Sequence, residues 1–388
     1  MTAADSRGHI ADSQYLQRLR RAQTLLGERA IGALLIGFGA ELRYLTGYEA
    51  LPLERLTMLV VSESSDPSLV VPRLEAMGAA LAPAVRAGGV EIVPWDETDD
   101  AYGIVGRKLD DELPPGSKVL VNDRLWAAHV FGLGRVLPEI ELGLASELLR
   151  ELRMVKEPAE IAALRSAAQA ADRVIDQIAS GRLVGRTEAD VSAEVRDRLI
   201  AEGHETADFA IVASGPNSAS PHHEASERVI QAGEPIVLDI GGLLDGYSSD
   251  TTRTIWVTGG DPAKGPDEEF IRIHGLVHEA QAEATSAIRP GMPCERLDGI
   301  ARHIIEAGGY GPQFLHRLGH GIGLEVHEDP YLVAGNEEPL PEGAAFSIEP
   351  GIYLDGRYGA RIEDIVVCGA DGPIVLNESS RELRVVDG

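Results

Sequence analysis

The sequence predicts two domains, an α/β domain followed by an α+β domain. The chain has 388 residues, of which 44% are hydrophobic, and this is more than a single core usually organises. Short apolar runs alternate with helix-like stretches up to about residue 150, which is typical of an α/β domain. Beyond that point long helices are separate from paired strands, which is typical of an α+β domain. We place the boundary at residue 154, giving domains 1–154 and 155–388.

A helix is expected at the start of the first domain. Ser13 is a suitable N-cap, and apolar residues follow it at helical spacing: Tyr15, Leu16, Leu19, Ala22, Leu25 and Leu26. Apolar runs then predict strands at residues 33–36, 56–61, 69–71, 91–93 and 118–121. Helix-like stretches lie at residues 73–82, 98–112 and 124–133. This alternation predicts a mixed or parallel sheet. No cluster of metal-ligand residues occurs here, so we interpret this domain as one that shapes and shields a site.

The second domain begins with a long helix. Pro158 stands at a first helical turn, and an Ala-rich stretch continues to Ala179. Further helices are expected at residues 187–202, 267–287 and 294–307. Strands are expected at residues 208–213, 235–240, 247–257, 344–349 and 361–367. Helices segregated from antiparallel hairpins predict the α+β class.

Composition and charge exclude several classes of partner and location. The formal net charge is −27, which repels nucleic acid and anionic membrane surfaces. The two cysteines, Cys294 and Cys368, form no CxxC pair, so a thiolate zinc site is excluded and a reducing compartment fits. The first 14 residues lack the features of a secretory signal, and no run of about 20 apolar residues occurs. We therefore expect a soluble, unprocessed, cytoplasmic protein.

Two acidic residues stand in an otherwise apolar hairpin. Asp239 interrupts the apolar strand 235–240, and Asp250 lies on the returning strand after a turn through Asp245 and Gly246. The midpoint between the two acids falls within this turn, so closing the hairpin places them roughly opposite each other. Facing carboxylates about 5 Å apart repel strongly unless a proton or a cation lies between them.

A second hairpin repeats this construction. Glu349 and Glu363 flank a turn whose centre, Gly356, is also the midpoint between them. A single acid in a strand often faces water. Two hairpins that each carry a facing pair of acids are difficult to explain as surface decoration, and they predict a metal site.

A histidine-rich segment lies between the two hairpins. The run HRLGHGIGLEVHE contains His316, His320 and His327, and its alternate glycines disfavour the helix that a zinc-protease HExxH motif requires. One neutral imidazole with four carboxylates suits Mn, Co, Fe or Zn better than Ca or Mg. Four negative charges also balance two divalent cations.

These motifs resemble the pita-bread metallopeptidases, family M24, which contains Xaa-Pro dipeptidase (prolidase), Xaa-Pro aminopeptidase and methionine aminopeptidase. The resemblance runs in order through DIGGLLDGYSSDTTRT, HRLGHGIGLEVHE, SIEPG and RIED. The leading domain, with LRYLTGY, resembles the creatinase-type N-terminal domain of the proline-specific branch. The resemblance therefore implies an α/β creatinase-like domain and an α+β pita-bread catalytic domain.

The resemblance also implies a role for individual residues. It implies that two divalent ions, with manganese favoured and Co, Fe or Zn as alternatives, are held by Asp239, Asp250, His320, Glu349 and Glu363. The catalytic residues would be His222, His327 and Glu349, with His222 as a hydrogen-bond donor to the transition state and Glu349 as a proton shuttle. Arg361 would orient a ligand carboxylate. The neighbouring His223 and His316 are left open.

The implied activity is hydrolysis of the bond between an N-terminal residue and proline. Several prolidases read the proline carboxylate with an arginine shortly after the H-E-x-P stretch, whereas this chain has Tyr331, the candidate substrate-binding residue there. A missing charged partner would make the preference for dipeptides modest. The alternatives are an Xaa-Pro aminopeptidase, a creatinase-like hydrolase of a small non-peptide amide, and a non-catalytic pita-bread binding protein. The expected partners are short proline-containing peptides and a second copy of the chain in a homodimer.

Overall fold

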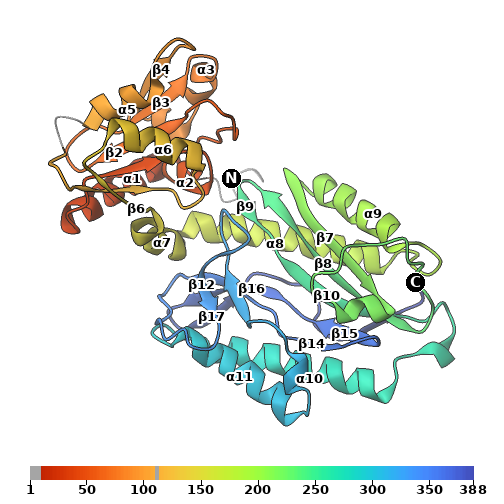
Figure 1. The fold of residues 1–388 in the computed structure, drawn as a ribbon. Coiled ribbons are helices and arrows are strands. Elements are labelled where there is room, and N and C mark those ends of the chain that lie inside the picture. The colour runs from red at the N-terminus through yellow and green to blue at the C-terminus, as the bar shows by residue number, and fades with distance from the viewer. Residues whose placement is uncertain (1–9, 110–112) are drawn as a thin grey trace, which may run out of the picture. The chain divides into compact units, whose positions relative to one another are not determined.

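The computed structural model describes residues 10–109 and 113–388, which divide into two compact units at Arg153 and Met154 (Figure 1). The first nine residues of the segment tested for a secretory signal, and the last three residues of the helix expected at 98–112, lie outside the described residues. Each unit is described separately below.

The N-terminal unit contains a six-stranded mixed sheet in the order β4-β3-β2-β1-β5-β6. The pairs β1–β2 and β2–β3 are antiparallel, and the pairs β1–β5, β3–β4 and β5–β6 are parallel. The strands are β1 (Ala33–Ile36), β2 (Met58–Ser62), β3 (Ser68–Pro72), β4 (Glu91–Trp95), β5 (Lys118–Val121) and β6 (Glu141–Leu144). The helices are α1 (Asp12–Glu28), α2 (Ala40–Thr46), α3 (Ala76–Ala79), α4 (Pro83–Arg86), α5 (Ala101–Leu109), α6 (Ala127–Val136) and α7 (Ser146–Met154).

Helices cover both faces of this sheet, since every residue of the central strand β1 is buried. Leu35 of β1 packs in one core with Val105 of α5 and Leu133 of α6. The apolar runs therefore predicted the five strands β1 to β5. Strand β6 and helices α2, α4 and α7 were not anticipated. Strand β6 reads ELGL and has no buried apolar run.

The C-terminal unit contains two five-stranded sheets and a two-stranded ribbon. The first sheet has the order β18-β10-β8-β7, and β9 pairs with β8; the second has the order β12-β11-β13-β16-β17. The strands of the first sheet are β7 (Thr206–Ser214), β8 (Glu234–Leu244), β9 (Tyr247–Ser248), β10 (Thr251–Val257) and β18 (Arg384–Val386). The others are β11 (Gly319–Gly321), β12 (Glu328–Leu332), β13 (Ala345–Ile348), β14 (Gly351–Leu354), β15 (Tyr358–Arg361), β16 (Asp364–Gly369) and β17 (Gly372–Val375).

Two pairs of helices pack on these sheets. The helices are α8 (Pro158–Ala179), α9 (Glu188–Ala201), α10 (Glu268–Ala287) and α11 (Cys294–Ala307), and the 3₁₀ helices are η1 (Gly215–Ala219), η2 (Pro262–Lys264) and η3 (Gly311–Gln313). Helices α8 and α9 share a core with β7, β8 and β10, whereas α10 and α11 share one with β13 and β16 (Figure 1). An isolated bridge between Thr252 and Glu363 connects the two sheets. This bridge joins a strand of the hairpin that carries Asp239 and Asp250 to Glu363 of the second hairpin.

The first hairpin closes two residues away from the register expected from its sequence. Its turn consists of Asp245 and Gly246, both with positive φ (49° and 83°), as in a type I′ turn. In this register Asp239 pairs with Thr252 rather than with Asp250. Asp250 is offset from Asp239 by two positions, and since side chains alternate along a strand it stays on the same face. The expected register, which placed the two acids roughly opposite each other, was therefore wrong by two positions.

The second hairpin has the expected register. Gly351 pairs with Arg361 in the ribbon, and Ile348 pairs with Asp364 in the adjoining sheet. Both pairs belong to one register, in which Glu349 falls opposite Glu363. The turn at Gly356, with a φ of 69°, is the midpoint of that register.

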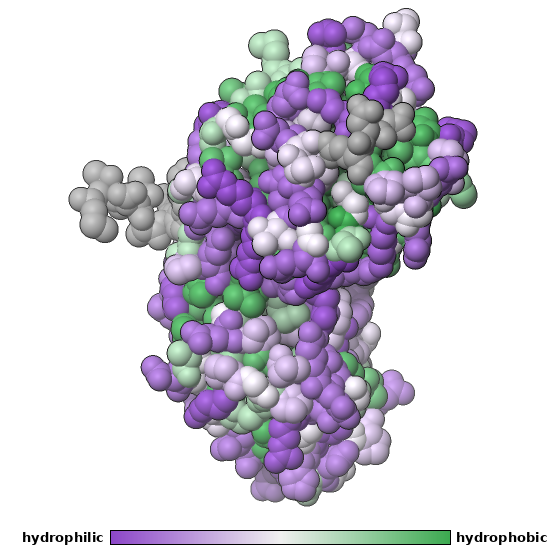
Figure 2. All heavy atoms as spheres, turned by 90° about the vertical axis from the view of Figure 1, so that its left-hand side faces the viewer, coloured by the Kyte–Doolittle hydropathy of each residue, from purple (hydrophilic) through white to green (hydrophobic). Residues whose placement is uncertain are grey.

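The surface agrees with the acidic composition. Hydrophilic residues predominate on the face drawn in Figure 2, and hydrophobic residues occur there in small groups. Within the described ranges, no helix combines the length and apolar character that crossing a membrane requires.

Candidate metal centre

A cavity of about 700 Å³ opens between the two sheets of the C-terminal unit. Its walls combine acids, histidines, two arginines and a few apolar side chains. The lining residues are Phe209, Ile211, Pro221, His222, Asp239, Asp250, His316, Arg317, His320, Val326, His327, Glu349, Arg361 and Glu363. The cavity thus brings together every candidate site residue except Tyr331.

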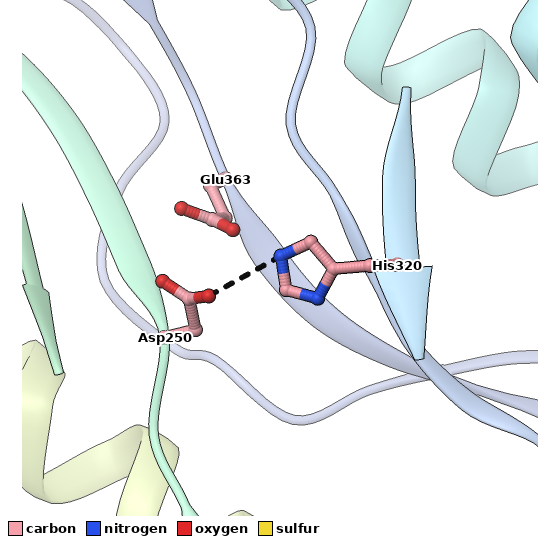
Figure 3. Close-up of side chains that lie close together, drawn as sticks. All are labelled: Asp250, His320 and Glu363. Atoms are coloured by element: carbon pink, nitrogen blue, oxygen red, sulfur yellow. Dashed lines mark ion pairs between the residues drawn. The ribbon is translucent and has the colours of Figure 1, made fainter. Parts of the chain in front are cut away.

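Three side chains from different segments converge on one point of this cavity. Asp250 precedes β10, His320 lies on β11, and Glu363 lies between β15 and β16. One ligand atom of each lies within 4.8 Å of the others, and Figure 3 shows the three side chains facing one another. His320 Nε2 is 3.5 Å from Asp250 Oδ2. All three residues are buried.

The orientation of His320 leaves one ring nitrogen facing the acids. Its Nδ1 lies 3.1 Å from the carbonyl oxygen of Gly321, and a carbonyl oxygen only accepts, so Nδ1 carries the hydrogen. Nε2 then faces Glu349 Oε1 at 3.2 Å as well as Asp250. When Nε2 also carries a hydrogen it donates to Glu349, and loss of that proton would leave the Nε2 lone pair for a metal ion.

Asp239 is held by an arginine at one oxygen only. Arg361 Nη2 donates to Asp239 Oδ2 at 2.5 Å. Asp239 Oδ1 is buried and has no hydrogen-bond partner among the described residues. Leaving such an oxygen unsatisfied is costly, which indicates that another group binds it.

The clustered acids oppose one another's ionisation. Burial, followed by the charge of Asp239, raises the pKa of Asp250 well above its usual range. Burial, followed by the charge of Asp250, likewise raises the pKa of Glu363. Burial would also raise the pKa of Glu349, but its hydrogen bond with His320 lowers that pKa to about 2. A divalent cation would remove the repulsion and satisfy Asp239 Oδ1, so this donor set fits a metal ion.

His222 and His223 point to different environments. His222 lines the cavity. His223 Nε2 instead lies 2.8 Å from Oε2 of the fully buried Glu188. The structure therefore places His222 at the cavity, and it places His223, which the sequence left open, in the supporting loop.

Glu188 ties together the loop that carries His222, and its role was not anticipated. The carboxylate accepts hydrogen bonds from backbone or side-chain groups of Ser214, Asn217, His223 and Ser226. These hydrogen bonds outweigh the effect of burial and lower the pKa of Glu188 to about 2. No local motif reveals this contact, because Glu188 begins α9 and its partners lie 26 to 38 residues further along the chain.

Tyr353 forms a further part of the site that sequence reasoning missed. Its hydroxyl accepts from Arg361 Nη1 at 2.8 Å and lies 2.9 Å from His316 Nε2. His316 Nδ1 donates to the carbonyl oxygen of Arg317, so in the neutral ring Nε2 accepts from Tyr353. Burial lowers the pKa of His316 and raises that of Tyr353 to about 12. The result is a directed chain of hydrogen bonds from Arg361 through Tyr353 to His316.

His327 and Tyr331 occupy different places around the cavity. The ring of His327 contacts that of His320 edge to face, with centroids 4.2 Å apart. Partial desolvation, followed by the charges of His320 and Arg317, lowers the pKa of His327 to about 4. Tyr331 pairs with His320 across β11 and β12 but is not among the cavity-lining residues. Its ring instead lies 4.4 Å from the guanidinium of Arg317, which does line the cavity.

Comparison with known families gives two matches that together span most of the chain. Residues 18–155 match the creatinase/prolidase N-terminal domain, and residues 162–370 match metallopeptidase family M24. These matches confirm the expected fold, a creatinase-type N-terminal domain followed by a pita-bread catalytic domain.

Individual relatives are similar over their whole length. The probable dipeptidase PepE of Mycobacterium tuberculosis is 43% identical over 375 residues, which cover 96% of both chains. An Xaa-Pro dipeptidase of Lactobacillus delbrueckii subsp. lactis is 33% identical, with 95% of this chain and 98% of that protein covered.

Solved structures give the same result. The crystal structure of dipeptidase PepE from Mycobacterium ulcerans superimposes with a TM-score of 0.89 and 41% identity over 97% of this chain and 99% of that one. The prolidase from Thermococcus sibiricus gives a TM-score of 0.87 and 34% identity over 96% and 99%.

Proposed function

The chain belongs to metallopeptidase family M24, and from this membership we propose that it is an Xaa-Pro dipeptidase, cleaving the bond between an N-terminal residue and a C-terminal proline. The observation that carries the proposal is the cavity, in which an acid and histidine cluster adjoins an apolar wall of Phe209, Ile211 and Val326. The relatives named as dipeptidases, which align over nearly their full length, support it.

As a member of this family the chain uses a divalent metal, and the number and identity of the ions are part of the proposal. We propose two ions, manganese by preference, which Asp239, Asp250, His320, Glu349 and Glu363 would hold. Four carboxylates balance the charge of two divalent cations, and one imidazole favours manganese over calcium. When bound, such ions lower the pKa of water and polarise the scissile carbonyl group.

The chain's own residues complete the reaction. His222 lines the cavity and donates a hydrogen bond to the oxygen on which negative charge develops as the carbonyl is attacked. Glu349 lines the cavity beside His320, and its carboxylate would accept a proton and pass it to the leaving nitrogen. His327, whose pKa is lowered to about 4, stays neutral and adds no positive charge beside His320.

Recognition of proline follows from its missing N–H. The nitrogen of an Xaa-Pro bond cannot donate a hydrogen bond, so a site that depends on that donor excludes proline. The apolar wall of Phe209, Ile211 and Val326 can instead recognise the ring by its shape.

We also propose that the protein acts in the cytoplasm as a homodimer. Both cysteines are free and buried, which fits a reducing compartment. Leu74, Met77 and Leu81 are 70% or more exposed within eight residues of the N-terminal unit, and such a group of apolar side chains fits a protein interface. Light scattering after gel filtration tests the assembly.

The direct test of function combines metal analysis with hydrolysis of three peptides. Purified protein should contain divalent metal and should cleave Ala-Pro faster than Ala-Pro-Ala, with Ala-Ala a poor substrate. Faster cleavage of Ala-Pro-Ala would favour an aminopeptidase. Metal-loaded protein that leaves every Xaa-Pro bond intact would refute the proposal.

A further inference from the structure

Two arginines line the described cavity, and one of them already makes four hydrogen bonds within the protein. Arg361 donates through Nε to Thr252 Oγ1, through Nη1 to Tyr353 and the carbonyl oxygen of Pro221, and through Nη2 to Asp239. Each of its three nitrogens therefore has an acceptor within the protein. These bonds use four of its five N–H groups, so Arg361 has no pair of free N–H groups with which to bind a second carboxylate.

Arg317 is the other arginine, and its guanidinium is free. No carboxylate of residues 10–109 or 113–388 lies within ion-pair distance of Arg317, and its side chain has no hydrogen-bond acceptor there. The guanidinium instead lies 4.4 Å from the ring centroid of Tyr331. An arginine stacked on a tyrosine keeps its N–H groups at the edge available for a planar acceptor.

The backbone on both sides of Arg317 is anchored to α11. Arg302 donates to the carbonyl oxygen of His316 at 3.0 Å, and the N–H of Leu318 donates to Asp298 Oδ1 at 3.0 Å. Arg302 and Asp298 form an ion pair, and Asp298 is only 1% exposed. Arg317 thus projects from a fixed point, and little ordering remains to be done when a ligand binds.

The location of Arg317 separates it from the metal-binding residues while keeping it in the same cavity. It follows His316, which contacts Tyr353, and precedes β11, which carries His320. Its positive charge reaches His327 and contributes to lowering the pKa of that ring. A negative group bound at Arg317 would therefore lie in the same cavity as the acid and histidine cluster, next to the guanidinium that Tyr331 supports.

We propose that Arg317, supported by Tyr331, binds the free carboxylate of the C-terminal proline of the substrate and thereby selects dipeptides. The proposal rests on the proposed Xaa-Pro dipeptidase function. A guanidinium matches a carboxylate with two parallel N–H···O bonds, and a longer peptide or a C-terminal amide has no negative group at that point. Arg317 is thus a specificity-determining residue, and Tyr331 positions it.

The test compares the wild type with Arg317→Gln and Arg317→Lys on two substrates, Ala-Pro and its C-terminal amide. Arg317→Gln should lower kcat/KM for Ala-Pro by about 10 to 150-fold, the range for a lost charge-assisted hydrogen bond. Its effect on the amide should be at least tenfold smaller. Arg317→Lys should have a kcat/KM for Ala-Pro between those of the wild type and Arg317→Gln, because lysine keeps the positive charge but lacks the two parallel N–H groups of the guanidinium. Arg296→Gln, which removes an exposed arginine outside the cavity, is the matched control.

Binding of the product separates this proposal from the proposed function. Metal-loaded protein is titrated calorimetrically with L-proline and with L-prolinamide, so no turnover is needed. The wild type should bind proline more tightly than prolinamide, and Arg317→Gln should lose that difference. Tyr331→Leu should weaken proline binding more than Tyr331→Phe, which keeps the aromatic ring.

The outcomes are distinct. Absence of Ala-Pro hydrolysis by the wild type would contradict the proposed function, whereas the proline titration would still test Arg317. Equal losses on Ala-Pro and its amide, or unchanged proline binding in Arg317→Gln, would overturn the proposal.

Discussion

Arg361 and Asp239 form a buried ion pair that uses one carboxylate oxygen and leaves the other unsatisfied. Nη2 lies 2.5 Å from Oδ2, while Oδ1 has no hydrogen-bond partner within residues 10–109 and 113–388. We infer that the arginine orients Oδ1 toward a metal ion. Arg361 also binds Thr252 and Tyr353. A lysine side chain at this position could not make the same set of contacts.

Arg361→Lys should therefore weaken metal binding by about 10 to 100-fold, the usual effect of removing a group that orients a ligand. Titration against a chromophoric chelator measures this affinity, and Arg296→Lys serves as the control because Arg296 is exposed. An unchanged affinity would show that Asp239 does not depend on Arg361 for its role.

Removal of the negative charge of Asp250 or of Glu363 should release metal. Asp250 and Glu363 are buried, and burial followed by the charges of neighbouring acids raises the pKa of both, which indicates that the cluster needs positive charge. Asp250→Asn or Glu363→Gln should lose at least one ion per chain and nearly all activity. Elemental analysis and kcat measure both effects, with the exposed Asp355→Asn as control. Full metal content and normal turnover in both variants would contradict a two-ion site.

The hairpins show how far sequence alone can predict this site. A carboxylate in an otherwise apolar strand is costly to bury in the core, so the strand context was enough to identify four carboxylates as candidate ligands. The Glu349 and Glu363 register followed from the turn at Gly356, because one uninterrupted register runs through both adjoining ladders. The Asp239 register was missed by two positions, since the midpoint between Asp239 and Asp250 was taken as the centre of the turn, whereas the turn is centred on Asp245 and Gly246.

Residues that act through long-range contacts could not be predicted in this way. Glu188 lies in an acidic first turn of α9, where carboxylates commonly favour the helix dipole, and nothing there indicates Ser226 as a partner. Tyr353 stands between two apolar residues in β14, so its sequence context is that of an ordinary core residue. The proposed role of Arg317 depends on the hydrogen bonds of Arg361, which join residues far apart in the sequence.

His222 should affect catalysis without affecting metal binding. It lines the cavity, whereas its neighbour His223 binds Glu188. His222→Ala should keep its metal and lose about 10² to 10³ in kcat, the usual effect of removing one donor to the transition state. Steady-state kinetics with metal analysis test this, and His303→Ala on α11 is an exposed control. Loss of metal from His222→Ala would instead identify it as a ligand.

Glu188 should stabilise the protein in a way that depends on pH. Its pKa is lowered from 4.5 to about 2 in the folded chain by hydrogen bonds from Ser226, Ser214 and His223 that outweigh burial. A carboxyl whose folded pKa is lowered contributes stability that is present above its unfolded pKa and is lost as the pH falls through its folded pKa. The lowered pKa corresponds to about 3 kcal/mol, which is fully present at pH 6 and decreases between pH 4.5 and pH 2.

Glu188→Gln should therefore lower the Tm at pH 6, and the difference from the wild type should narrow as the pH falls below 4.5. The amide keeps the size of the side chain but meets donors at both of its ends, so it loses bonds without creating a cavity. Thermal unfolding of both proteins across this range measures the effect, with the exposed Glu279→Gln on α10 as control. Because the same bonds hold the loop of His222, the variant should also lower kcat at pH 7 more than it raises KM. A Tm difference that stays constant from pH 6 to pH 3 would mean that the ionised carboxylate is not what holds this loop.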